Sequence, residues 1–262
     1  MGLAALLTAF ALAVTPVSFV QSHNSNGAFA ESGGTADTSL TSWAVLGLHA
    51  VGADAPGSLA YLQAQEPNLQ TANDISLVAL AQEALGAHPD ALLARLRVKA
   101  RPSGQIGETL NSTFWAVLAL GRSTPATTRF ILAQQSKAGG FAWYLHGETD
   151  SNDTAAALEA LRVAGVHGPP VTRAARFLLS FQNADGGFEL SRGRGSDAQS
   201  TAWAIQGLVA AGRTPPRSAF AYLAKLKRPD GSYRYSARYA ATPVWVTSQV
   251  LAALAKKPFP LP

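Results

Sequence analysis

The sequence predicts an all-α fold in which six helix pairs close into a ring of six inner and six outer helices. Three observations support this prediction. Apolar residues recur at helical rather than alternating spacing in paired runs. The pairs repeat about every 45 residues, a period typical of helical solenoids and closed rings. Finally, the first repeat and the last run, 246–255, are both apolar, whereas an open solenoid needs polar capping repeats. The two ends are therefore expected to meet.

The stretch 177–212 shows the repeating unit most completely. An apolar run ends in Gln182, an Asp-Gly-Gly turn follows, and a second apolar run closes at Gly212. Glycine can end the first helix because it adopts the left-handed conformation at little cost. Asp197, three residues before Ser200, is placed to cap the second helix. The stretch therefore predicts an αα-hairpin.

The aromatic residue of this turn identifies the other copies. Each copy has its turn residue two positions after a glycine, at Phe29, Ile106, Phe141, Phe188 and Tyr233, and a shortened copy occupies 62–74. Outer helices are predicted at about 16–22, 56–66, 89–99, 125–135, 171–182 and 216–227. Inner helices are predicted at about 40–51, 74–85, 111–120, 153–164, 199–211 and 243–255. Proline lies near the start of each outer helix, where its missing N–H costs little.

Length and composition favour one large domain over 14–262. The chain has 262 residues, of which 47% are hydrophobic and 14% charged. It has no cysteine, which excludes disulfides, thiolate metal sites and cysteine nucleophiles. Residues 1–13 are apolar and include an Ala-Leu-Ala resembling a signal-peptidase site. We interpret them as a signal or anchor segment, which favours secretion or the cell envelope, or as the start of the first outer helix.

The charges are distributed unevenly. Residues 1–94 hold seven acidic and no basic residues, whereas residues 95–262 hold all 21 bases and nine acids. This asymmetry favours an anionic ligand or surface near the later repeats, and leaves a membrane surface open as a partner. Nucleic acid is not expected, because no basic stripe interleaved with aromatic residues is present.

The repeats resemble the QW-type repeat of the terpenoid cyclase/protein prenyltransferase family, which includes the squalene-hopene cyclases. The resemblance rests on an F-x-x-x-x-Q segment, a Gly-Gly-aromatic turn and an inner helix with S/T-x-W. Phe177–Gln182 and Phe130–Gln135 match the first element, while Tyr222–Lys227 has lysine for glutamine and the first repeat has His23 there. The resemblance implies a closed α/α toroid over residues 14–255.

The resemblance also allows the family's chemistries to be checked against this chain. Class II terpene cyclases carry a D-x-D-D-T-A motif whose middle carboxylate protonates an alkene or epoxide. The stretch 150–155 reads DSNDTA, so that Asn152 occupies the place of the proton donor. An amide cannot supply that proton. The zinc site of the prenyltransferases includes cysteine, which this chain lacks. We therefore expect no metal and no cofactor.

Repetition separates structural from functional candidates, because a reaction centre needs asymmetry. Asp37, Asp150 and Asp197 lie at equivalent positions and are read first as helix caps. Three tryptophans are likewise equivalent and are read first as inner-ring packing, with ligand stacking as the alternative: Trp43, Trp115 and Trp203.

The candidates for function combine two of these repeated residues, Asp150 and Trp203, with residues that are largely specific to single repeats. The catalytic candidates are Asp150 and Asp153. The ligand-binding candidates are the insertion residues Trp143, Tyr144 and His146, the residues of the basic later repeats Arg194, Arg234 and Tyr235, and the tryptophans Trp203 and Trp245.

The functional expectation is a non-catalytic binding module for a polyprenyl or similar lipid-like ligand, with the acid motif degenerate. One alternative is a class II-like cyclase that uses Asp150 or Asp153. Another is a cell-surface interaction scaffold, for which the central cavity should be closed.

Overall fold

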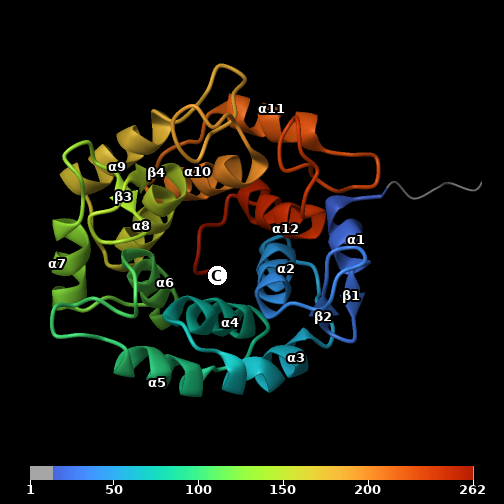
Figure 1. The fold of residues 1–262 in the computed structure, drawn as a ribbon, viewed down its shortest axis with the longest axis horizontal. Helices are drawn as coiled ribbons and strands as arrows, with labels where there is room; N and C mark the ends of the chain where they lie inside the picture. The colour runs from blue at the N-terminus through green and yellow to red at the C-terminus, as the bar shows by residue number, and fades with distance from the viewer. Residues whose placement is uncertain (1–13, 262) are drawn as a thin grey trace, which may run out of the picture.

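The computed structural model describes residues 14–261, and its helices form two concentric rings (Figure 1). The inner ring consists of α2 (Thr38–Ala50), α4 (Ala72–Ala84), α6 (Leu110–Leu120), α8 (Ser151–Val163), α10 (Ala198–Ala210) and α12 (Pro243–Leu254). The outer ring consists of α1 (Pro16–Gln21), α3 (Ser58–Gln65), α5 (Asp90–Val98), α7 (Pro125–Ala133), α9 (Pro169–Leu179) and α11 (Arg217–Leu226). A 3₁₀ turn, η1 (Glu66–Asn68), follows α3. The predicted all-α toroid is confirmed, and its twelve described helices lie at the predicted places.

Two short antiparallel ribbons connect outer to inner helices. Strand β1 (Asn24–Ser25) pairs with β2 (Ala28–Phe29), and β3 (Phe141–Ala142) pairs with β4 (Thr149–Asp150). The second ribbon leads directly into α8, with Phe141 opposite Asp150. It therefore fixes the start of α8, which Asp150 caps and which carries Asp153 in its first turn.

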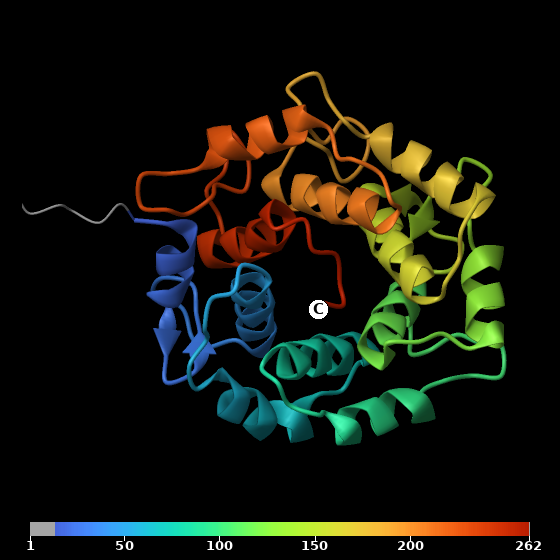
Figure 2. The same cartoon turned by 180° about the vertical axis from the view of Figure 1, so that it is seen from behind.

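The ring closes where α12 packs against α2, as Figures 1 and 2 show from opposite sides. The two helices approach so closely that a Cβ on Gly47 would lie 2.2 Å from the carbonyl oxygen of Ser248. The Glu31 carboxylate accepts hydrogen bonds of 3.0 and 2.9 Å from the backbone N–H groups of Val244 and Trp245, at the start of α12. The first repeat thus caps the last helix, and a negative charge at a helix N-terminus is stabilising.

Each hairpin is held by side chains that recur in the repeats. The turn residues Phe29, Ile106, Phe141, Phe188 and Tyr233 are buried, and the backbone N–H of each donates to a threonine hydroxyl of the following inner helix. Gln182 donates to the carbonyl of Gly186 in the turn and to the Ser218 hydroxyl on the next outer helix, both at 2.9 Å. Gln135 likewise donates to Gly139 and Pro170. These two glutamines therefore tie each turn to the next outer helix.

Aspartate caps also fall where the repeat predicts them. Asp37, Asp150 and Asp197 each accept a hydrogen bond from the backbone N–H three residues on, at the starts of α2, α8 and α10. One contiguous hydrophobic core, to which all six inner helices contribute, fills the space around and between the rings.

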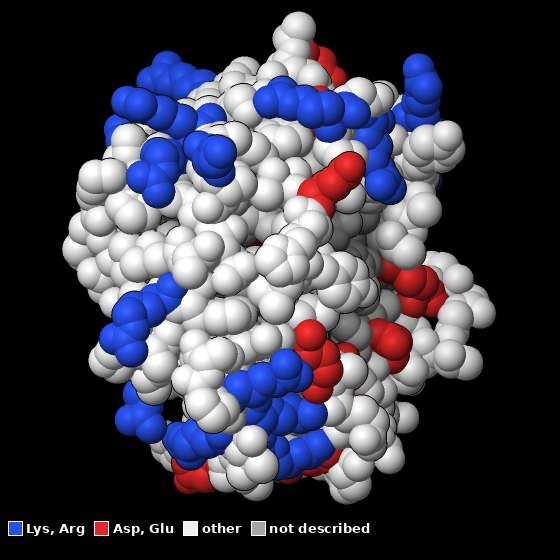
Figure 3. Space-filling model, turned by 60° about the vertical axis from the view of Figure 1, so that its left-hand side comes forward, with Lys and Arg blue, Asp and Glu red and all other residues white. Residues whose placement is uncertain are grey.

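Lysine and arginine side chains form separate groups on the outer face in Figure 3, with uncharged surface between them. None of the helices described within 14–261 is long and apolar enough to cross a membrane. The segment 1–13, interpreted above as a signal, an anchor or a helix start, lies outside the described residues.

Candidate ligand-binding and active site

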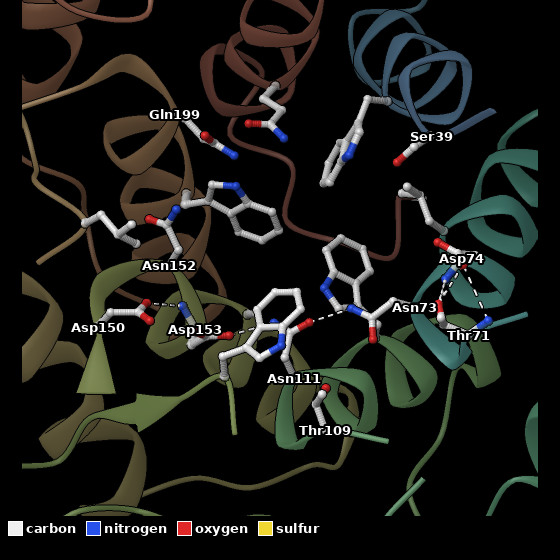
Figure 4. A pocket seen from close by; sticks show the side chains of 18 of the residues that line it. Ser39, Thr71, Asn73, Asp74, Thr109, Asn111, Asp150, Asn152, Asp153 and Gln199 are labelled. Atoms are coloured by element: carbon white, nitrogen blue, oxygen red, sulfur yellow. Dashed lines mark hydrogen bonds between the residues drawn. The ribbon is translucent and has the colours of Figure 1, made fainter. Parts of the chain in front are cut away.

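A pocket of about 690 Å³ occupies the centre of the ring (Figure 4). It opens at the end where the inner helices begin, because their first residues and the loops before them line it. All five tryptophans of the chain line this one pocket: Trp43, Trp115, Trp143, Trp203 and Trp245. Such a concentration of aromatic surface around a void is typical of a site for an apolar ligand.

The wall of the pocket consists of two layers separated by about one helical turn. The outer layer, here called the mouth ring, takes the second residue of five inner helices and the third of α12: Ser39, Asn73, Asn111, Asn152, Gln199 and Trp245. The inner layer, here called the deep ring, lies four residues further along each helix: Trp43, Leu77, Trp115, Ala156, Trp203 and Gln249. The pocket is therefore polar at its entrance and largely apolar below.

The tryptophans of the deep ring pack against one another. They come from alternate inner helices, α2, α6 and α10. Their ring centroids lie 5.5 to 5.7 Å apart, and their planes are nearly perpendicular. This edge-to-face arrangement is the favoured one for aromatic pairs. The three residues thus pack with one another, as the primary prediction had it, and also present surface to the pocket, which was the alternative.

Amide side chains connect three inner helices at the mouth. Asn73 donates from Nδ2 to Oδ1 of Asn111 at 2.6 Å, and Asn111 donates from Nδ2 to Oδ1 of Asp153 at 2.6 Å. The Asp153 carboxyl is therefore oriented by a relay that starts two helices away (Figure 4). Preorganised donors of this kind stabilise negative charge that develops on an acceptor.

The surroundings of Asp153 favour its protonated form. It is 4% exposed. Burial, together with the hydrogen bond and the repulsion from Asp150, raises its pKa to about 9. Burial also raises the pKa of Asp150, which is opposed by its hydrogen bonds with Asp153 and Asn152. The two carboxyls share a site, so that one of them holds the proton while the other stays the better acceptor.

Asn152 lies in the mouth ring beside this pair. The position has amides in four of the six inner helices, at Asn73, Asn111, Asn152 and Gln199. Asn152 therefore follows the common pattern of this chain, and the acidic group lies one residue later, at Asp153. Asp74 lies at the same place in α4 and lines the pocket too, where it forms a capping box with Thr71.

The insertion before α8 extends over the pocket mouth. Trp143 and Tyr144 line the pocket, are 43% and 62% exposed, and form an aromatic pair with centroids 6.3 Å apart. The backbone carbonyl of Trp143 accepts from the N–H of Asn111, which ties the loop to α6. His146 is exposed, has a positive φ of 61°, and does not line the pocket.

The basic candidates lie elsewhere. Arg194 and Tyr235 line a second cavity of about 680 Å³, between the loops that precede α10 and α12. The guanidinium of Arg234 donates to the backbone carbonyls of Ser236 and Ala237, and this residue lines neither cavity. The candidate residues named from the sequence therefore fall into two groups. Trp143, Tyr144, Trp203, Trp245, Asp150 and Asp153 lie together, whereas Arg194, Arg234, Tyr235 and His146 do not join them.

Sequence reasoning found the tryptophans of both rings but missed the polar residues of the mouth ring and Leu77, Ala156 and Gln249 of the deep ring. Single asparagines and a glutamine have no distinctive motif, but they recur at a fixed offset from each helix start, and aligning the helix caps would have revealed them. No group of three or more histidine, aspartate or glutamate side chains arranged to hold a metal ion occurs within residues 14–261.

Comparisons with known proteins agree with this geometry. The family model described as "Prenyltransferase alpha-alpha toroid domain" matches residues 17–225 and 170–242. Among solved structures, the type II terpene cyclase MstE from Scytonema is 17% identical, with a TM-score of 0.70 over 92% of this chain and 95% of that one. A protein from Actinoplanes is 17% identical, with a TM-score of 0.70 over 92% and 97%.

A more distant likeness reaches the protein prenyltransferases. Protein geranylgeranyltransferase-I from Candida albicans, complexed with GGPP, is 13% identical, with a TM-score of 0.61 over 83% of each chain. No curated protein matches. At these identities the structural likeness shows the fold, while the family model covers most of the chain. The chain belongs to the prenyltransferase alpha-alpha toroid domain family.

Proposed function

We propose that the central pocket binds a polyprenyl chain. The observation that carries this proposal is the gathering of all five tryptophans around one cavity that is polar at the mouth and largely apolar below. Its volume of about 690 Å³ lies within the usual range for small-molecule sites. An extended isoprenoid fits such a site because its methyl-branched chain buries apolar surface while a polar head stays at the amides.

The solved relatives support this ligand class. MstE has a structure in complex with geranylgeranyl dihydroxybenzoate, its substrate, and another relative is complexed with GGPP. An interaction scaffold, the third functional alternative, predicted a closed cavity, and the open pocket counts against it.

The test uses the tryptophans as reporters. Geranylgeraniol, added to the purified protein, should change tryptophan fluorescence saturably. Ala156→Trp places a fourth indole in the deep ring and should weaken binding at least tenfold, roughly the loss of 1.4 kcal/mol. Leu179→Trp adds the same fluorophore at a position that is 40% exposed on the outer ring, and should bind like wild type. Lack of binding by the wild type, or unaltered binding by Ala156→Trp, would overturn the proposal.

A second candidate function is proton-initiated cyclisation of that chain, favoured by the protonated Asp153 beside the pocket. In this step the O–H bond of Asp153 breaks and a C–H bond forms at a terminal alkene carbon. An internal alkene attacks the resulting carbocation and closes a ring. A C–H bond next to the final cationic carbon then breaks, which leaves a double bond and releases the proton. The reaction is an isomerisation, so that no oxidant or co-substrate is needed.

The surroundings of Asp153 would help this transfer. A carboxyl with a raised pKa holds its proton at neutral pH but gives it up reluctantly, so the site must stabilise the products of the step. Asn111 donates to the carboxylate that forms. Indole faces of the deep ring can stabilise the cation through their π-electrons.

Two substitutions test this candidate. Asp153→Asn should reduce formation of a cyclised product from geranylgeranyl dihydroxybenzoate or geranylgeranyl diphosphate at least about 100-fold, while fluorescence still reports binding. Asn152→Asp completes the D-x-D-D-T-A motif and should accelerate cyclisation. Turnover that persists in Asp153→Asn would exclude Asp153 as the donor. Binding without any product in wild type, but with product in Asn152→Asp, would instead identify a binder with a degenerate acid motif.

A further inference from the structure

The segment after α12 turns back into the ring, and Figures 1 and 2 show it ending at the centre. It approaches from the side opposite the pocket mouth, because its partners lie beyond the deep ring on α8 and α10. No residue of 255–261 lines the pocket itself. The segment therefore closes the far end of the ring.

Three hydrogen bonds hold this segment in place. The backbone N–H of Phe259 donates to Oε1 of Glu159 at 3.1 Å, and Nη2 of Arg162 donates to the Phe259 carbonyl at 2.6 Å. Nε2 of Gln206 donates to the carbonyl of Lys257 at 3.4 Å. Glu159 is fully buried, and burial raises its pKa to about 8, against the lowering effect of the Phe259 N–H and of Arg162. Inner-helix side chains are thus used to bind backbone groups of this segment.

The ring of Phe259 supports the deep ring from below. It is 1% exposed, and its centroid lies 5.8 Å from Trp43, 6.2 Å from Trp115 and 6.4 Å from Trp203. All three tryptophans also line the pocket. The indoles are therefore held between the pocket and one phenylalanine, and their depth in the channel depends on it.

We propose that residues 256–261 support the deep ring from below and that Phe259, acting through the three tryptophans, sets the length of isoprenoid that the pocket accepts. This inference rests on the proposed binding of a polyprenyl chain. Phe259 is a positioning residue, since it does not touch the ligand space itself.

The expected effect follows from size. Phe259→Ala removes the six ring carbons, and an isoprene unit has five carbons. Space opened below the indoles lets them move away from the mouth, so that the pocket can take about one more unit. In an apolar site a single added methylene changes selectivity by roughly 10- to 200-fold. Incomplete movement of the indoles reduces this, and we expect a change of about tenfold.

The experiment measures fluorescence-detected dissociation constants for farnesol, geranylgeraniol and geranylfarnesol. Phe259→Ala should raise the preference for geranylfarnesol over geranylgeraniol about tenfold relative to wild type. Leu261→Ala is the matched control, because Leu261 lies on the same segment but is only partly buried and has no aromatic ring to pack on the tryptophans. It should leave the preference unchanged. An unchanged preference in Phe259→Ala, with wild-type binding intact, would overturn the length role alone.

Phe259→Leu guards against misfolding of the alanine variant. It keeps an apolar side chain below the tryptophans. It should shift the preference for geranylfarnesol over geranylgeraniol in the same direction by a smaller factor. If wild type binds none of the three alcohols, the proposed function fails and the length role fails with it. If both variants bind all three more weakly by the same factor, Phe259 only stabilises the fold, and the inference is wrong.

Discussion

Helices α8 and α10 are capped alike, but they differ in the third residue of the helix. Asp150 and Asp197 cap them in the same way, each accepting from the backbone N–H three residues on. In α10 that third residue is Ser200, whose hydroxyl donates to the second carboxylate oxygen of Asp197 at 2.9 Å. In α8 it is Asp153, a second carboxyl. The carboxylate that caps α10 therefore receives a second hydrogen bond from a hydroxyl. The carboxylate that caps α8 lies beside a second carboxyl instead.

The difference shows how a repeat protein acquires a titratable site without changing its backbone. Burial raises the pKa of Asp197, while its hydrogen bonds to Ser200 and the nearby Arg194 oppose the rise. At α8, no cation is among the groups that shift Asp150 and Asp153, and the proton stays within the pair. The mouth ring then places this pair beside the ligand space.

The largest expected effect is on the pH dependence of stability. Because the pKa of Asp153 rises from 3.8 unfolded to about 9 folded, the native state binds more protons between these values. Stability contributed by the neutral form therefore falls as pH rises through this window, by up to about 1.4 kcal/mol per pH unit for one proton. In Asp153→Asn, the slope of the free energy of unfolding against pH should lose the contribution of about one proton. Urea unfolding between pH 5 and pH 8 measures this slope.

In Asp153→Asn, the dependence of stability on pH should become weaker but should not disappear. Asp150, Glu159 and Asp197 are shifted in the same direction and remain in the variant. Glu159→Gln, at a buried site away from the mouth, should remove a comparable share. An identical slope in wild type and Asp153→Asn would show that Asp153 is charged in the folded protein.

The second test gives the start of α10 the pair of acids that is found at the start of α8. Ser200→Asp places a second carboxyl beside Asp197 at a position that is 1% exposed. We expect a loss of about 2–4 kcal/mol in the free energy of unfolding at pH 8, because one acid must stay protonated or be buried charged. The loss should shrink at pH 4. Ser200→Asn, similar in size but uncharged, is the control, and equal losses at both pH values would contradict the charge argument.

The smallest effect concerns the caps themselves. Asp197→Ala removes a buried cap with two partners and should cost about 1–2 kcal/mol. Asp37→Ala removes the equivalent exposed cap of α2 and should cost about 0.5–1 kcal/mol. Thermal or urea unfolding of both variants measures the difference. A larger loss for Asp37→Ala would mean that burial does not strengthen these caps.

The fold was predictable because it depends on local patterns repeated six times. Helical spacing, proline at helix starts and the Gly-aromatic turns were enough to place all twelve described helices. Ring closure was predictable from the apolar character of both ends, and the packing of α12 on α2 shows it.

The site was predictable only in part. Trp143, Trp203, Trp245 and the two acids at the start of α8, Asp150 and Asp153, do line one pocket, but Arg194 and Tyr235 line a separate cavity. Charge patterns along the chain do not show which side of a loop an arginine occupies. The contact of Phe259 with Trp43 joins residues more than 200 positions apart and depends on the path of an irregular segment, which has no periodic signature.

The protonation state of Asp153 at neutral pH tests the account most directly. Infrared difference spectroscopy between wild type and Asp153→Asn at pH 7 isolates the carboxyl absorption of this residue. The account predicts a neutral carboxylic-acid C=O band that is present in wild type, absent in the variant, and lost only as the pH approaches about 9. A carboxylate band at pH 7, with no neutral band lost on substitution, would contradict it.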